Sequence, residues 1–216
     1  MIEGGRIALK MWGRLSSLPY IRFLIMKLID NNLKSFQVTG RLPQWAIWLI
    51  AVALFGLTWL GVGVWARAAA MRDLATHTDH WDDSGILQQE TNYTCVPASI
   101  VMLLKDAGID STTYEAATVA GTDIRGTDGG GIIQAGEHYG FDVIHERMDF
   151  DEFMARGLPA IVILKYNGIP HAAYVLPIKE MGAVEVKDPI QGLLHFYKDG
   201  ADEYFGMEQW DVYLFD

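Results

Sequence analysis

Three residues able to carry out nucleophilic chemistry stand at separate points of the sequence: Cys95, His171 and Asp188. Cys95 is the only cysteine in the chain, so an intramolecular disulfide cannot explain it. A thiol beside an imidazole can pass its proton to the ring and become a nucleophile. A carboxylate beside the same ring orients it and stabilises its cation. Together the three types predict acyl transfer through a thioester, with amide hydrolysis as the expected reaction.

Gln89 adds a fourth group, since it precedes Cys95 by six residues. Its amide can donate a hydrogen bond, together with the backbone N–H of Cys95, to the oxyanion that forms during acyl transfer. Gln88 is the alternative for this role. Taken singly, each residue has an ordinary explanation, because a lone cysteine is usually a small core residue and an aspartate before Pro189 is a common turn choice. The joint pattern favours a site.

The cysteine is expected at the start of a helix. A polar turn precedes Cys95, apolar residues follow from about 96 to 107, and Gly108 stands where a helix C-cap glycine is typical. In the first turn of a helix the unpaired backbone amides and the positive end of the dipole favour a thiolate over a thiol. Cys95 is therefore predicted to be reactive.

The histidine and the aspartate are expected on neighbouring strands. Apolar runs at 160–166, 171–178 and 183–187 are separated by turn residues and predict an antiparallel meander. His171 opens the second strand and Asp188 closes the third, just before Pro189. Adjacent antiparallel strands can bring these two side chains together, so the chain predicts an α+β domain with the site beside its sheet.

Several of these motifs carry a resemblance to a known family. The stretch QETNYTCVPAS at 89–99 resembles the start of the bacteriocin-processing C39 peptidases and their C39-like relatives, which pair such a glutamine with a cysteine followed by Gly-Pro-Ala. GTDGGG at 126–131, with the following helix to Gly140, resembles the Gly-Thr turn and second helix of that family. PH at 170–171 and KDP at 187–189 resemble its histidine strand and Asp-Pro turn. The resemblance covers about residues 84–216.

The resemblance implies a papain-like cysteine peptidase fold, in which the helix carrying the cysteine packs on an antiparallel sheet. It also implies a role for each residue: Cys95 as nucleophile, His171 as general base and then acid, Asp188 as orienting carboxylate and Gln89 as oxyanion donor. No cofactor and no metal are expected.

Two departures from the family pattern lie beside these residues. Val96 replaces the common glycine after the cysteine, and Ala172 and Ala173 replace bulkier apolar residues after the histidine. The first is expected to affect the oxyanion side and the second the neighbouring packing. Neither removes a catalytic group.

A different kind of segment precedes this domain. Residues 45–66 carry no charge over 22 residues, and at about 1.5 Å rise per residue such a helix matches the roughly 30 Å thickness of the hydrocarbon layer. Tryptophans near both ends are typical of membrane interfaces. The prediction is a single transmembrane helix. The alternative is a cleaved signal peptide, with small residues at Ala66, Ala68 and Ala70 near a cut.

Charge gives the helix a direction. The formal net charge is -10, but the residues before Trp45 carry about +5 and the remainder about -15. An excess of Lys and Arg on one side predicts a cytoplasmic N-terminus at the inner (cell) membrane. The domain is then periplasmic or extracellular, as in a bacterium. The acidic remainder has no basic surface for nucleic acid, so a nucleic-acid partner is excluded.

The predicted organisation therefore has four segments. Residues 1–44 form a cytoplasmic basic segment with an interfacial helix at about 16–31, which binds membrane lipid or docks on other membrane-protein subunits. Residues 45–66 cross the membrane, 67–83 form a stalk and 84–216 form the C39-like domain. The stalk's histidines and aspartates resemble metal ligands, but a solvated linker is favoured because no second ligand cluster is visible. Gly129–Gly131 are expected to form a flexible turn near the cleft, since they lack the Lys-Ser/Thr of a phosphate-binding loop.

Two functions remain open from the sequence. The first is a membrane-anchored cysteine peptidase that hydrolyses a peptide or protein substrate on the extracytoplasmic side. In the family that the chain resembles, substrates are often leader peptides cut after Gly-Gly by a peptidase fused to a cytosol-facing exporter. That geometry differs from the orientation expected here. The second is a catalytically silent C39-like subunit that binds or stabilises a partner membrane complex, because a fold does not settle a function.

Overall fold

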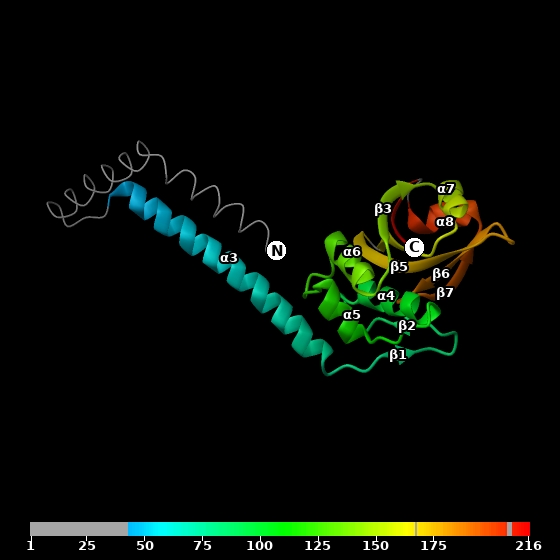
Figure 1. Ribbon diagram of the computed structural model, residues 1–216, viewed down its shortest axis with the longest axis horizontal. Helices are drawn as coiled ribbons and strands as arrows, with labels where there is room; N and C mark the ends of the chain where they lie inside the picture. The colour runs from blue at the N-terminus through cyan, green and yellow to red at the C-terminus, as the bar shows by residue number, and fades with distance from the viewer. Residues whose placement is uncertain (1–42, 167, 207–208) are drawn as a thin grey trace. The chain divides into compact units, whose positions relative to one another are not determined.

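The computed structural model describes residues 43–166, 168–206 and 209–216 (Figure 1). The interfacial helix expected at 16–31 lies outside the described residues. The chain divides into two compact units, Met1–Gly61 and Val62–Asp216.

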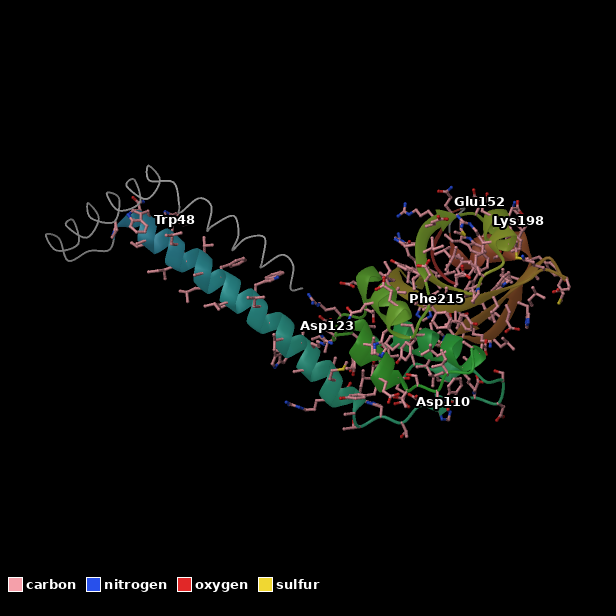
Figure 2. All side chains as sticks on the ribbon, in the orientation of Figure 1. Trp48, Asp110, Asp123, Glu152, Lys198 and Phe215 are labelled. Atoms are coloured by element: carbon pink, nitrogen blue, oxygen red, sulfur yellow. The ribbon has the colours of Figure 1, made fainter. Side chains whose placement is uncertain are left out.

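The apolar segment forms helix α3 (Gln44–Leu74), which contains the predicted span 45–66. Its large side chains are exposed, for example Trp48 at 66% and Phe55 at 70%. Figure 2 shows side chains projecting from both sides of the helix, with Trp48 near its beginning. Among the described helices, α3 is the one that is long and apolar enough to cross a membrane, by length and composition alone. Apolar residues all round a helix are expected when lipid surrounds it.

The segment expected to be a stalk is structured over most of its length. Helix α3 continues eight residues past Ala66 to Leu74, and both Ala70 and Leu74 are buried within the unit Val62–Asp216. Strand β1 (His80–Trp81) then pairs antiparallel with β2 (Leu87–Gln88). Small residues at 66 and 70 allow the end of the helix to approach the domain closely, which the charge pattern alone did not indicate.

Side-chain carboxylates of the aspartates in this segment accept hydrogen bonds from backbone amides. Asp82 Oδ1 accepts hydrogen bonds from the backbone amides of Ser84 and Ile86, each at 2.9 Å, and so closes the turn between β1 and β2. Asp79 Oδ2 accepts from the backbone amide of Thr113 at 3.0 Å. In the described part of the chain, no three His, Cys, Asp or Glu side chains are grouped as metal ligands would be.

The domain is built on a six-stranded antiparallel sheet with the order β3-β8-β4-β5-β6-β7. The three predicted strands are present, at β4, β5 and β6. The bounds are β3 (Val143–Met148), β4 (Ala160–Tyr166), β5 (Ile169–Ile178), β6 (Ala183–Asp188), β7 (Gly192–Phe196) and β8 (Trp210–Phe215). Turn residues separate β4, β5 and β6, as their spacing predicted.

Helices cover both faces of this sheet. Helices α4 (Cys95–Asp106), α5 (Thr113–Ala120) and α6 (Gly129–His138) lie on one side, and α7 (Phe150–Arg156) and α8 (Lys198–Phe205) on the other (Figure 1). Alternation along the strands divides the core accordingly: Ile161 and Tyr174 belong to the first cluster, Val162 and Val175 to the second. The prediction of an α+β papain-like fold, with the cysteine helix packed on an antiparallel sheet, is confirmed.

Helix α4 follows the predicted pattern closely. It begins at Cys95 and ends at Asp106, and Gly108 just beyond it has a φ of 76°. That left-handed conformation suits glycine and ends the helix. The residues from Val96 to Leu104 are all buried, so packing on every side stabilises this helix and fixes where its first residue lies.

The glycine run differs from the prediction, because it forms the first turn of α6 and not a flexible turn. The Asp128 side chain caps this helix by accepting from the Gly131 amide at 2.8 Å. A Cβ atom at Gly131 would lie 2.1 Å from the Ala120 carbonyl oxygen, and one at Gly129 would lie 2.2 Å from the Tyr213 hydroxyl. These glycines are therefore explained by the close approach of α6 to its neighbours.

This packing predicts that alanine substitutions at two adjacent glycines change the stability of the protein in opposite directions. Gly131→Ala should lower the free energy of unfolding by about 1–3 kcal/mol, because the obstructing atom belongs to the backbone of α5. Gly130→Ala is the matched control: its Cβ would meet only Asp128 Oδ1, at 3.4 Å, and alanine favours the helix by up to about 1 kcal/mol. Denaturant unfolding of the full chain in detergent, followed by tryptophan fluorescence, measures both. A Gly131→Ala protein as stable as the Gly130→Ala protein would contradict this account.

Candidate active site

His171 and Asp188 meet because of the register between β5 and β6. Tyr174 pairs with Lys187, so the next position along β6, Asp188, stands on the same face as His171 and diagonal to it. The ring Nε2 of His171 lies 3.0 Å from Asp188 Oδ1 and 3.1 Å from Oδ2. The two side chains are 5% and 0% exposed, so water hardly screens the pair.

Several other groups satisfy the Asp188 carboxylate. The backbone amides of Ile190 and Gln191 donate to Oδ1 at 2.6 and 3.0 Å, and the Tyr204 hydroxyl of α8 donates to Oδ2. Burial acts to raise the pKa of Asp188, but the hydrogen bond and charge of His171, with the bonds from Tyr204 and Gln191, lower that pKa below its usual range. Asp188 is therefore an anion with its direction fixed.

Cys95 approaches the same ring from α4, which packs on β5. The thiol is half-buried and is hydrogen-bonded to the imidazole of His171. Because Nε2 faces Asp188, Nδ1 is the ring nitrogen left for the sulfur. Cys95 and His171 both line a cavity of about 300 Å³. The structure thus brings together the three residues that the sequence singled out.

The two neighbours of His171 change its protonation. Burial acts to lower the pKa of the ring, but the hydrogen bonds to Asp188 and Cys95, together with the charges of those groups, raise that pKa to about 9. The imidazole is therefore a cation at neutral pH, and it can supply a proton to a group that leaves from the cavity.

Gln89 is held beside the Asp188 turn by hydrogen bonds of its side chain and its backbone. Its Nε2 donates to the Thr91 carbonyl at 3.1 Å, and its backbone amide donates to the Pro189 carbonyl at 3.0 Å. Its Oε1 is buried without a hydrogen-bond partner among the described residues. An amide nitrogen carries two hydrogens, so one donor remains beyond the bond to Thr91. The alternative, Gln88, donates to Asp82 Oδ2 at 3.1 Å.

The cavity has aromatic and charged walls that the sequence motifs did not indicate. Tyr93 comes from the turn before α4, Arg125 from the loop before α6, and Asp211 and Tyr213 from β8. Tyr204, which holds Asp188, was also missed. These residues lie far apart in the chain, and their types are common on protein surfaces, so no local pattern distinguishes them.

The two departures from the family pattern are accommodated by packing. Val96 is buried and lines the cavity beside Cys95. Ala172 and Ala173 are both fully buried, on opposite faces of β5, and belong to different core clusters. The hydroxyl of Ser99 on α4 donates to the Ala172 carbonyl at 3.3 Å. The small side chain of Ala172 lets α4 approach β5 closely enough for the thiol to contact the imidazole.

A larger cavity of about 580 Å³ lies elsewhere, between the end of α3 and the beginning of α5. It is lined by Leu74, His77, Asp79 and Glu90 among others, and not by Cys95, His171 or Asp188. Judged by volume alone, this cavity would be the candidate active site. The positions of Cys95 and His171 identify the smaller cavity as the candidate instead.

Comparison with known proteins agrees with this geometry. The model of the Peptidase C39 family matches residues 83–206. An uncharacterized protein of Methanothermobacter marburgensis is 27% identical over 123 residues, which are 57% of this chain and 84% of that protein. An uncharacterized protein of Methanothermobacter thermautotrophicus is 30% identical over 110 residues, which are 51% of this chain and 75% of that protein.

Solved structures share the fold. The peptidase domain of Streptococcus ComA, a bifunctional ABC transporter involved in a quorum-sensing pathway, has a TM-score of 0.50 and 20% identity over 60% of this chain and 95% of that domain. A double-glycine-motif protease from an AMS/PCAT transporter, in complex with its leader peptide, has a TM-score of 0.50 and 18% identity over 60% of this chain and 90% of that protease.

The charged state of His171 is open to direct measurement. Nuclear magnetic resonance of histidine-labelled protein should show the His171 ring as an imidazolium at pH 7 that loses its proton at about pH 9. Because the pKa is raised on folding, the stabilisation from this proton is complete below about pH 6.5 and is lost as the pH rises through about 9. Asp188→Asn should shift the midpoint downward, since the anion that holds the cation is gone. A neutral ring at pH 7 in the unmodified chain would contradict the arrangement.

Proposed function

Because the chain belongs to the peptidase C39 family, and because Cys95 and His171 line one cavity while the buried carboxylate of Asp188 holds the imidazole, we propose that it is a membrane-anchored cysteine peptidase. The observation that carries the proposal is the position of the His171 ring. It is hydrogen-bonded to Cys95 and lies 3.0 Å from the carboxylate of Asp188, with little access to water. A structural histidine needs no cysteine beside it, whereas an acyl-transfer site needs both neighbours.

The proposed reaction begins with attack of the Cys95 sulfur on a substrate carbonyl, which forms a tetrahedral oxyanion. The backbone N–H of Cys95 is available for this oxyanion, because the first residue of a helix has no carbonyl one turn earlier. The free hydrogen on Gln89 Nε2 is the second proposed donor. His171 then gives its proton to the departing amine, and the C–N bond breaks to leave a thioester on Cys95.

Water completes the cycle. With its proton gone, His171 accepts a proton from a water molecule, which attacks the thioester carbonyl. The C–S bond breaks, the carboxylic acid leaves and Cys95 is regenerated with His171 protonated. Asp188 keeps the ring in one orientation throughout and does not take the proton itself.

The proposed substrate is a peptide or protein segment. Two structurally similar proteins are a peptidase domain of a transporter and a double-glycine-motif protease from a transporter, the second in complex with a leader peptide, which supports a peptide carrying small residues at the cut. The exposed apolar stretch of α3 supports a membrane anchor. The positive charge before residue 45 supports a cytoplasmic N-terminus and an extracytoplasmic domain.

Thiol chemistry tests the proposal without knowledge of the substrate. Cys95 is the only thiol, so iodoacetamide uptake by the full chain reports on one atom. At pH 7 the unmodified chain should react about 100-fold faster than His171→Ala, because the imidazole takes the thiol proton. His195→Ala is the matched control and should keep the original rate, since His195 pairs with Glu185 outside the cavity. Slow labelling that does not depend on His171 would contradict a peptidase and favour a silent subunit that binds a partner complex.

Gln89 is expected to act only when an oxyanion forms. Gln89→Ala should lower the turnover of a double-glycine leader peptide by about 100-fold, while iodoacetamide labelling stays at the original rate because alkylation forms no oxyanion. Gln88→Ala is the control, since Gln88 donates to Asp82, and should leave turnover unchanged. Equal losses in the two variants would exclude the assigned role.

A further inference from the structure

Tyr93 joins the active-site cavity to the end of α3. Its side chain lines the cavity that holds Cys95 and His171. Its hydroxyl donates a hydrogen bond to Asp73 Oδ2, in the last turn of α3. Burial, and then the bond to Asp73, raise the pKa of Tyr93 to about 12. The hydroxyl therefore keeps its proton and remains a donor throughout the neutral range.

The end of α3 is held against the domain by contacts on α5. Arg67 Nη2 donates to the Thr118 carbonyl at 2.9 Å, and the Thr118 hydroxyl lies 3.3 Å from Met71 Sδ. Ala70 and Leu74 are buried on the same helix. All of these residues belong to the unit Val62–Asp216. Asp73 is thus part of a docked segment and has a defined position beside the domain.

The backbone of the turn before Cys95 is fixed independently of Asp73. The Thr94 hydroxyl donates to the Thr91 carbonyl at 3.1 Å and accepts from the Thr91 amide at 3.3 Å. Thr94 is buried. These bonds hold the turn and the beginning of α4, whereas the Tyr93 hydroxyl donates its hydrogen bond to Asp73. Asp73 therefore affects the position of the Tyr93 side chain in the cavity wall more than it affects the position of Cys95.

That wall faces the space a substrate must occupy. The same cavity is lined by Ile169 and Pro170 at the beginning of β5 and by Tyr213 on β8. A peptide that reaches Cys95 therefore contacts Tyr93 together with residues from two strands. A shift of about 1 Å in such a contact can lower a reaction rate by about 100-fold.

We propose that Asp73 is a positioning residue of the peptidase site, which holds Tyr93 in the cavity wall so that a peptide substrate binds productively only when the end of α3 is docked. The inference rests on the proposed function and extends it, because it makes the segment after the apolar stretch a part of the substrate site. Asp73 does not touch the reacting atoms and acts through Tyr93.

Two reagents that react with the single thiol separate positioning from activation. Iodoacetamide is small and reports on the Cys95–His171 pair, whereas acetyl-Leu-Gly-Gly-chloromethyl ketone must also seat a peptide in the cavity. In the full chain, Asp73→Ala should weaken the saturable binding of the peptide reagent by about tenfold and leave the iodoacetamide rate unchanged. Tyr93→Phe should do the same, and the double variant should be no worse than either single one, because both remove one interaction.

Two further variants serve as controls. Asp73→Asn keeps an acceptor for the Tyr93 hydroxyl and should restore most of the binding, whereas Asp83→Ala removes another exposed carboxylate and should have no effect. Amide hydrogen exchange should show an intact α4 in every variant.

The outcomes are distinguishable. Unchanged kinetics of the peptide reagent in Asp73→Ala would overturn the inference. An equal loss of reactivity toward both reagents in that variant would overturn it too. The inference would also fail if the unmodified chain reacted quickly with iodoacetamide and did not react with the peptide reagent. Slow, His171-independent labelling of the unmodified chain would instead overturn the proposed function.

Discussion

A carboxylate without access to water is costly unless donors surround it, and Asp188 is such a group. Its oxygens accept hydrogen bonds from two backbone amides of the turn after β6, from the hydroxyl of Tyr204 and from the ring of His171. These donors come from different elements of the domain. The turn, α8 and β5 must therefore all be in place before this anion is stabilised. The orientation of the His171 imidazole depends on the positions of all three elements.

The rest of the domain supplies positions for this pair. The register of β5 against β6 sets the two side chains on one face of the sheet, and the small residue Ala172, in the same core cluster as α4, allows that helix to approach. Tight packing of α4 on every side fixes Cys95 at its first position. On the other edge of the same cavity, glycines at the beginning of α6 leave room for Tyr213. The geometry of the candidate site is therefore a consequence of close packing by small residues on both sides of the cavity.

The features that sequence alone predicted are those with a local signature. A helix start after a polar turn marked Cys95, and strand ends next to turn residues marked His171 and Asp188. The α+β architecture followed from the same patterns. Tyr93 and Tyr204 could not be found this way, because each acts through a partner distant in the chain, Asp73 and Asp188 respectively.

The errors have physical causes of the same kind. Polar residues between 67 and 83 resembled a solvated linker, but Asp79 and Asp82 accept backbone hydrogen bonds and the end of α3 packs on α5. The glycines at 129–131 resembled a flexible turn, yet they begin a helix, in which steric closeness to Tyr213 and Ala120 explains Gly129 and Gly131. In both places tertiary contacts, which composition does not report, decide the structure.

The presence of a single sulfhydryl has a consequence for the lifetime of the protein. Oxidation of a cysteine first gives a sulfenic acid, which a neighbouring thiol can convert to a disulfide before irreversible damage follows. Cys95 has no such neighbour within its own chain. Reduction of a Cys95 sulfenic acid by a thiol therefore requires a thiol from another molecule, whichever compartment holds the domain.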